Sequence, residues 1–393
     1  MSKVYQSVEK IISDLPAIRE VCVSLRETLL ANLVMLGEIP APTFKEEARV
    51  NFLMQRFSEC GLTNTSSDEC GNGFGIVPGK DRDRNILVHA HADTVFSERR
   101  DHTVSVHADR IVGPGIADNS LGLAVLTTLP TILERLGIEL KAGLVLMGGA
   151  RSLGRGDLEG IRFFLDNNKM PLTAGICVEG VQLGRLSYAS AGMLRGEVTC
   201  RVSEEYDWIR RGATGAILVI NEVINRILGI PLPRRPQTSI VLGSVESGAG
   251  FNIIPTEATL RFEVRSESSE IVQEIASELD DIMEDVRSQT AAEVTLDVVA
   301  RREVAGLEIG HPLVKQTREI MSSFDLTPHI TPSISELSAM IAHNVPALTL
   351  GITDGDHLHE QREAVQIDPI FTGLAQLIAV LLAIDGGFCD ESE

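Results

Sequence analysis

The alternation of short apolar runs with longer helical stretches restricts the fold of this chain more than any other feature. Strand-like runs lie near residues 74–77, 86–88, 144–147 and 176–178, and helical stretches are expected at 21–37, 46–60, 121–136 and 158–167. Alternating strands and helices are typical of a sheet covered by helices. The pattern therefore predicts an α/β sandwich.

From about residue 194 the order changes to strand, helix, strand, strand, helix, strand. These six elements are expected at Arg195 to Val202, Ala216 to Leu228, Ser239 to Ser244, Glu257 to Arg265, Glu270 to Ser288 and Glu293 to Ala300. That order is ferredoxin-like. We therefore expect an inserted α+β domain at residues 194–304, and a first domain built from residues 1–193 and 305–393, which resumes with helices at 313–324, 336–342 and 369–384 around a strand at 347–350.

Composition excludes several classes of partner. A chain of 393 residues has room for two domains. The net charge of −20 argues against nucleic acid and anionic membranes, since both would be repelled. The longest apolar stretch, residues 374–384, is too short to span a bilayer, and the amino terminus lacks a signal-peptide pattern. We expect a cytoplasmic protein whose six cysteines, without a Cys-x-x-Cys pair, are reduced thiols.

A possible metal site begins at the end of the strand at 86–88. His91-Ala-Asp93 follows that strand directly, and residues two apart in a strand project to the same face. His91 is thus placed to bind a metal, with Asp93 close enough to hold or tune it. For an isolated pair, a satisfied histidine beside a surface carboxylate is the alternative.

Asp118 lies in a glycine-rich turn formed by Gly113, Gly115 and Gly122, at the entrance of the helix near Leu121. A phosphate loop is the competing interpretation, but the lysine and spacing of that motif are missing. An ordinary helix N-cap is another.

Further candidate ligands follow at other predicted loop ends. Glu179 comes after the apolar run 174–178, and His357 and His359 precede Glu363 late in the chain. Histidines and carboxylates at the loop ends of an alternating strand and helix pattern match the ligand set of zinc or a similar divalent ion.

In these motifs the chain resembles metallopeptidase family twenty, the group that includes aminoacylase, acetylornithine deacetylase, succinyl-diaminopimelate desuccinylase, peptidase T and glutamate carboxypeptidase. The resemblance covers nearly the whole length. Its motifs, in order, are Gly37-Glu-Ile-Pro-Ala-Pro, His91-Ala-Asp-Thr-Val, Gly115-Ile-Ala-Asp-Asn, Asn252-Ile-Ile-Pro255 with Arg265, and His359 with Glu363.

The resemblance implies a zinc-peptidase-type mixed sheet with an inserted lid and dimerisation domain, and hence a homodimer. Family members hold two zinc ions bridged by one Asp, which corresponds to Asp118 here. His91 and Glu179 would complete the first metal, and His359 would serve the second. We expect one or two zinc ions, with cobalt or manganese as alternatives. Asn252 matches a lid residue that contacts the substrate carboxylate in relatives, and Arg265 lies downstream of it as in the family. An ordinary loop entering a strand is the alternative interpretation of the Asn252 motif.

The chain departs from the family at a Glu-Glu pair, whose members act as general base and as second-zinc ligand. Those positions fall on Arg151 and Ser152. Arg151 cannot accept a proton at neutral pH, and Ser152 is a poor zinc ligand. Arg151 would instead replace the second metal electrostatically or bind a substrate carboxylate. Asp93, Asp354 and Asp356 are the acids that would replace the general base. Asp157 and Glu159 lie nearer in sequence, but on a helix they would more often face solvent.

A second departure lies in the inserted domain. Relatives use a histidine there to stabilise the oxyanion, but the sequence has no histidine between Leu194 and Gly310. Hydrogen-bond donors in the corresponding region are Tyr206, Trp208, Arg210 and Arg211.

Three functions follow as hypotheses. The first is a metal-dependent hydrolase of low activity that acts on an amide bond of a small peptide or N-acyl amino acid. In this hypothesis Asp93 is a catalytic residue, and Arg151 occupies the position of the general base. The second is a degenerate relative that binds a small ligand without hydrolysis. The third is a structural role, in which the candidate metal-binding residues only stabilise the fold.

Overall fold

The computed structural model describes residues 5–203, 215–251, 253–290 and 292–390. The chain divides into two compact units. The first contains residues Met1–Ala189 and Gly306–Glu393, and the second contains Ser190–Ala305. Each unit has its own hydrophobic core.

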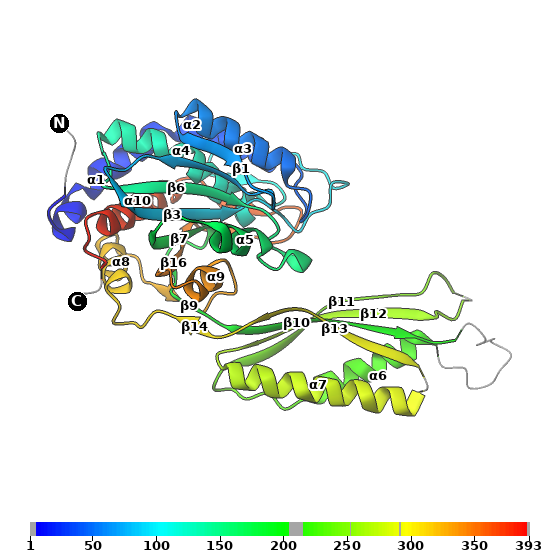
Figure 1. The fold of residues 1–393 in the computed structure, drawn as a ribbon. Helices are drawn as coiled ribbons and strands as arrows, with labels where there is room; N and C mark the ends of the chain where they lie inside the picture. Colours follow the sequence, from blue (N-terminus) through cyan, green and yellow to red (C-terminus); the bar gives the residue numbers. More distant parts are fainter. Residues whose placement is uncertain (1–4, 204–214, 252, 291, 391–393) are drawn as a thin grey trace. The chain divides into compact units, whose positions relative to one another are not determined.

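The first unit is built on an eight-stranded mixed sheet with the order β1-β2-β6-β3-β7-β16-β8-β15 (Figure 1). Its strands are β1 Thr63–Ser67, β2 Gly73–Val77, β3 Asp81–His91, β6 Ala142–Gly149, β7 Leu172–Val181, β8 Arg185–Ser187, β15 His329–Ile330 and β16 Ala347–Thr353. The four central strands β6, β3, β7 and β16 are mutually parallel, so their carboxyl ends meet at one edge of the sheet.

Side chains alternate between the two faces of these strands. On β3, Ile86 and Val88 join the larger core, whereas Leu87 joins a smaller core on the opposite face. The parallel strands are buried on both faces, as expected for a sheet covered by helices on each side.

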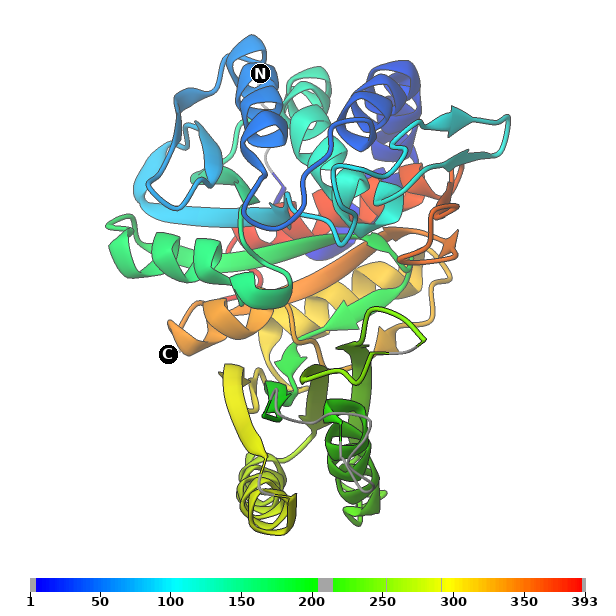
Figure 2. The same cartoon turned by 90° about the vertical axis from the view of Figure 1, so that its right-hand side faces the viewer.

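Helices cover both faces of the sheet (Figures 1 and 2). One face carries α1 Val8–Ser24, α2 Arg26–Gly37, α3 Glu47–Glu59, α4 Leu121–Leu136, α8 Pro312–Ser323 and α10 Ile370–Asp385, and the other carries α5 Glu159–Asn167 and α9 Leu337–Ala342. The expected single helix at 21–37 is wrong at its start. A break at Leu25 separates α2 from α1, and α1 continues through Pro16.

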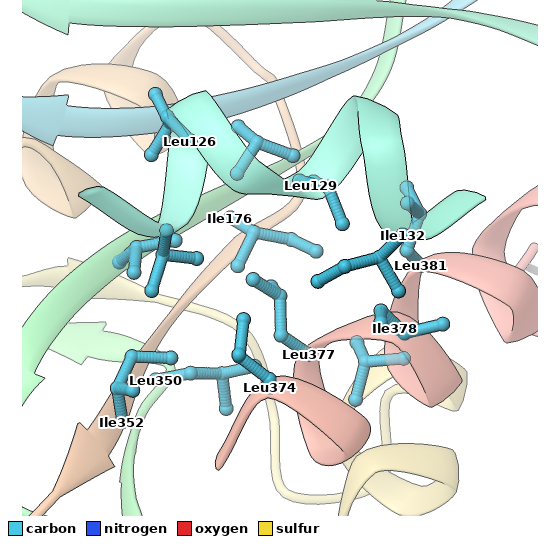
Figure 3. Close-up of a cluster of buried hydrophobic side chains, with 14 of the residues drawn as sticks. Leu126, Leu129, Ile132, Ile176, Leu350, Ile352, Leu374, Leu377, Ile378 and Leu381 are labelled. Carbon is cyan, nitrogen blue, oxygen red and sulfur yellow. The ribbon is translucent and has the colours of Figure 1, made fainter. Parts of the chain in front are cut away.

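The centre of the larger core lies between α4, α10 and the sheet (Figure 3). Its labelled side chains are Leu126, Leu129, Ile132, Ile176, Leu350, Ile352, Leu374, Leu377, Ile378 and Leu381. The helical stretch Ile116–Leu136 is long and apolar enough to cross a membrane, but 89% of its most apolar window is buried inside the structure, as in the core helix of a soluble protein.

Two small sheets complete the first unit and its boundary. One has the order β17-β18-β5-β4, formed by Gly355–Asp356, Ala364–Gln366, Arg110–Val112 and Ser105–Val106. The other pairs β9 Ala189–Ser190 with β14 Ala305–Gly306, where the chain passes between the two units.

The second unit is a four-stranded antiparallel sheet with two helices. Its elements are β10 Gly192–Arg201, α6 Ala216–Gly229, β11 Thr238–Ser247, β12 Glu257–Ser266, α7 Ser269–Thr290 and β13 Glu293–Arg302. The strand order β11-β12-β10-β13 is the ferredoxin-like order. Apolar residues of both helices pack on the inner face of the sheet. The predicted fold class, a mixed α/β sandwich with a ferredoxin-like insert, is therefore confirmed.

Candidate metal centre

Three side chains from three elements converge at the carboxyl edge of the large sheet. His91 ends β3, Glu179 lies near the end of β7, and Asp118 belongs to the short helical segment Ile116–Ser120 that precedes α4. One ligand atom from each residue lies within 4.8 Å of the ligand atoms of the other two. One imidazole and two carboxylates at such separations form a group able to hold a divalent cation.

The His91 ring is held from both of its nitrogens. Nε2 lies 2.8 Å from Asp118 Oδ1, and Nδ1 lies 2.9 Å from the backbone oxygen of Asp93. A histidine whose Nδ1–H donates to a backbone carbonyl presents Nε2 to a metal in a fixed orientation. Burial lowers the pKa of His91, but hydrogen bonds with Asp118 and Asp93 outweigh it and raise the pKa well above the ordinary value.

Asp118 lies between two histidines. Its Oδ2 is 2.9 Å from His359 Nε2, so its two carboxylate oxygens contact His359 and His91 separately. Burial would raise the pKa of Asp118, but the hydrogen bonds from both imidazoles hold it well below its usual range. His359 is 60% exposed at its side chain, whereas His91 is buried.

Glu363 connects the segment of Asp118 to that of His359. Its Oε1 accepts hydrogen bonds from the backbone N–H groups of Ala117 and Asp118, and its Oε2 accepts one from the N–H of His359. Glu363 is fully buried. It therefore positions the two segments through their backbones and has no ligand role in this arrangement.

Glu179 is the carboxylate of the group that is least compensated by protein contacts. Burial raises its pKa to about 7, although the positive charges of Arg185 and His91 oppose that shift. A half-buried carboxylate whose charged form is disfavoured gains from a cation bound beside it. This observation and the mixed nitrogen and oxygen donor set show that the residues fit a divalent metal.

Asn119 attaches the segment of Asp118 to β7. Its Nδ2 donates to the backbone oxygen of Val178, and its Oδ1 accepts from the N–H of Gly180. The Asn119 amide thus binds the backbone on both sides of Glu179. Gly180 permits this approach, since a Cβ there would lie only 2.1 Å from the oxygen of Ala117. Sequence reasoning missed both roles, because neither residue carries a recognisable signal on its own.

Asp93 faces the turn at residues 151–153, which contains Arg151 and Ser152. Its Oδ2 accepts hydrogen bonds from Thr43 Oγ1 and from the N–H of Leu153, both at 2.8 Å. Its Oδ1 lies 3.4 Å from His91 Nδ1 and has no hydrogen-bond partner. The carboxylate is thus fixed between His91 and the turn.

The Arg151 side chain contacts Glu159 and Phe44, which lie outside the candidate metal-binding group. Its Nη1 lies 2.7 Å from Glu159 Oε1, and its guanidinium lies over the ring of Phe44. The buried carboxylate of Glu46 accepts the backbone N–H of Arg151, which fixes the turn. Ser152, in contrast, is buried and its hydroxyl has no hydrogen-bond partner.

Other residues singled out in the sequence lie elsewhere. Arg265 is on β12 of the second unit, where its guanidinium pairs with Glu263. Asp356 lines a cavity of about 380 Å³ together with Arg26, Arg110 and other residues. Asn252 falls outside the described residues, and so do Tyr206, Trp208, Arg210 and Arg211.

Comparisons with known proteins agree with this architecture. Residues 210–291 match the family model described as the peptidase dimerisation domain. No curated protein matches the sequence.

Solved structures match nearly the whole chain. The di-peptidase Dug1p from Saccharomyces cerevisiae has a TM-score of 0.78 at 13% identity, covering 96% of this chain and 99% of its own. Human carnosine dipeptidase 1 has 0.74 at 10% identity, covering 94% and 99%. The Bacillus subtilis YXEP protein, a dinuclear metal binding peptidase from the M20 family, has 0.62 at 14% identity, covering 92% and 98%. The chain therefore has the fold of M20 family peptidases, which confirms the resemblance to metallopeptidase family twenty at the level of fold.

Proposed function

We propose that this chain, which has the fold of M20 family peptidases and contains a peptidase dimerisation domain, is a metal-dependent hydrolase that cleaves an amide bond in a small peptide or N-acyl amino acid. The observation that carries the proposal is the convergence of His91, Asp118 and Glu179 from three separate elements. Solved structures with this fold include a di-peptidase and a carnosine dipeptidase, which supports a short peptide as substrate.

The proposed cation is zinc, with cobalt or manganese as alternatives, held by His91 Nε2 and by the carboxylates of Asp118 and Glu179. When bound, such an ion supplies a Lewis acid for the substrate carbonyl and lowers the pKa of water. His359, through its contact with Asp118 Oδ2, is the residue that would hold a second ion.

The protein residues around the cation have separate tasks in this proposal. The backbone oxygen of Asp93 fixes the His91 ring, and Glu363 fixes the segments of Asp118 and His359. Asp93 Oδ1 lies 3.4 Å from His91 Nδ1, so we propose that the Asp93 carboxylate holds the His91 imidazole in the orientation that presents Nε2 to the cation. Arg151 pairs with Glu159, so we assign it no part in proton transfer.

We further propose that two copies of the chain associate through the second unit. β11 is an edge strand of its sheet and exposes Val241 and Val245, while α6 exposes Leu218 and Leu228. Exposed apolar groups on an edge strand and a neighbouring helix are suited to association with a second copy. Sedimentation velocity should give a dimer, and Val245→Glu should shift it towards monomer.

The experiment that tests the function combines metal content with hydrolysis. Protein purified without chelator or histidine tag is supplied with zinc, cobalt or manganese, and bound metal is measured by elemental mass spectrometry. Release of free amine is then followed with dipeptides and N-acetyl amino acids. We expect at least one ion per chain and hydrolysis that is lost in His91→Ala. A metal-loaded chain that cleaves none of these substrates would contradict the proposal and favour a binding protein.

A further inference from the structure

A fully buried arginine lies beside the strand end that carries His91. Arg49 belongs to α3 and is 0% exposed. Its guanidinium donates hydrogen bonds to backbone oxygens: Nε and Nη2 donate to that of Ile39 at 3.2 and 2.6 Å, and Nη1 donates to that of Ala92 at 3.2 Å. A buried charge costs free energy unless it is paired or hydrogen-bonded. The buried position of Arg49 therefore depends on these two carbonyl groups.

The carbonyl group of Ala92 lies between two residues of the candidate centre. Ala92 separates His91 from Asp93, and its C=O belongs to the same peptide unit as the N–H of Asp93. Because a peptide unit is planar, a hydrogen bond to that oxygen fixes the direction in which the backbone enters Asp93. The backbone oxygen of Asp93 lies 2.9 Å from His91 Nδ1. Arg49 thus binds the peptide unit next to the carbonyl that orients the His91 ring.

The second acceptor of Arg49 begins a segment that lies beside the end of β3. Beyond Ile39, the backbone oxygen of Ala41 accepts a hydrogen bond from the N–H of Thr94 at 2.8 Å. Two residues further on, Thr43 Oγ1 donates to Asp93 Oδ2, also at 2.8 Å. The arginine therefore joins two segments that share further contacts, one of which holds the Asp93 carboxylate.

We propose that Arg49 is a positioning residue of the candidate metal centre. By clamping the carbonyl groups of Ile39 and Ala92, it fixes the backbone at the end of β3. The same clamp keeps the segment of Thr43 against the Asp93 carboxylate, and the two effects together strengthen the binding of a divalent cation. The inference rests on the proposed metal-dependent function.

Arg49 acts through the backbone and supplies no ligand atom. A guanidinium carries only hydrogen-bond donors, so it cannot coordinate a cation. Its planar fork lets one side chain reach two separate carbonyl groups, which a lysine ammonium cannot do in the same geometry. Residues that orient metal ligands from outside commonly change metal affinity about 10- to 100-fold when they are replaced.

The test is zinc affinity, measured on the full chain by competition with a chromophoric chelator. Arg49→Lys keeps the positive charge but loses the planar fork, and we expect it to weaken zinc binding about 10-fold or more. Arg84→Lys is the matched control, because Arg84 also donates to a backbone oxygen, that of Ile384, but lies near the start of β3. The control should bind zinc as the wild type does.

A cobalt spectrum separates positioning from a loss of stability. The visible absorption of bound cobalt depends on how its ligands are arranged, whereas a less stable protein that is still folded keeps the same arrangement. Cobalt-loaded Arg49→Lys should therefore differ in its spectrum from the wild type and from Arg84→Lys. Binding is measured at a temperature at which circular dichroism shows each metal-free protein to be folded.

A second variant keeps the inference testable if Arg49→Lys does not fold. Thr43→Val removes the hydrogen bond to Asp93 Oδ2 and leaves the buried arginine in place. Because this bond lies in the segment that Arg49 clamps, we expect zinc affinity to fall several-fold in Thr43→Val.

Wild-type zinc affinity or an unchanged cobalt spectrum in Arg49→Lys overturns this inference. If that variant does not fold, wild-type affinity in Thr43→Val overturns it. A wild-type chain that binds zinc but hydrolyses no amide contradicts the proposed function alone. A wild-type chain that binds no divalent cation overturns both.

Discussion

His91 Nε2 and Asp118 Oδ1 lie 2.8 Å apart although 27 positions separate the two residues in the chain. The contact forms because β3 delivers His91 to the sheet edge, while Glu363 and Asn119 fix the backbone on either side of the Asp118 side chain. The geometry of the centre therefore depends on buried polar residues that are not ligands.

Metal binding should depend on pH through Glu179. Its pKa is raised to about 7 by burial, and a cation requires the deprotonated carboxylate. Protons at Glu179, and at His91 whose pKa is also raised, therefore compete with the metal, and affinity should fall steadily as the pH is lowered. Isothermal titration with zinc across pH 5.5–8.5 checks this. Glu179→Gln should bind zinc far more weakly at every pH, and a pH-independent wild-type affinity would contradict the assignment.

Replacing Glu363 should destabilise the first unit. Glu363→Ala leaves three backbone N–H groups, at Ala117, Asp118 and His359, without their acceptor. An unsatisfied buried donor costs about 1 kcal/mol or more, but the N–H groups of Asp118 and His359 are only partly buried, so we expect a loss of about 1–3 kcal/mol in the free energy of unfolding, measured with urea. Glu363→Gln keeps the acceptor oxygens in part and should lose less. Equal losses in the two variants would argue against the hydrogen-bonding role.

Gly180 should not tolerate a side chain. A Cβ at this position would lie 2.1 Å from the backbone oxygen of Ala117, next to Asp118. Gly180→Ala must therefore push β7 away from that segment, with an expected cost of about 1–3 kcal/mol and weaker zinc binding. Gly229→Ala is the control, since no atom lies within 4 Å of a Cβ there. Urea unfolding and zinc titration of both variants check the prediction.

Arg151 should contribute little to metal binding. Its guanidinium pairs with Glu159 at the surface, and exposed ion pairs of this kind contribute about 0–1 kcal/mol. Arg151→Ala should therefore leave zinc affinity within a few-fold of the wild type and change the free energy of unfolding by less than about 1 kcal/mol. A large gain in affinity would show that the charge opposes the cation and would contradict the observed orientation.

The element order of both units was predictable from periodicity. Each of the six elements expected at 194–304 is present, because amphipathic helices and alternating strands leave a local signal. The local signal failed at α1, which continues through Pro16, a residue that usually ends a helix. It also failed at β1, whose five residues are polar and largely exposed and therefore show no alternation.

The sequence by itself determined the chemical types of the centre: a histidine and acids at the ends of predicted strands, and a turn without the expected Glu pair. Only the tertiary structure decided which acids act together. The chain has 55 acidic residues, and the sequence pattern around Glu363 does not show that this acid holds the segments of Asp118 and His359 through their backbones. That role comes from burial and from partners far away in the chain, and both arise only when the strands and helices pack. The free energy of a buried charge depends on those non-local neighbours, which a local sequence pattern does not specify.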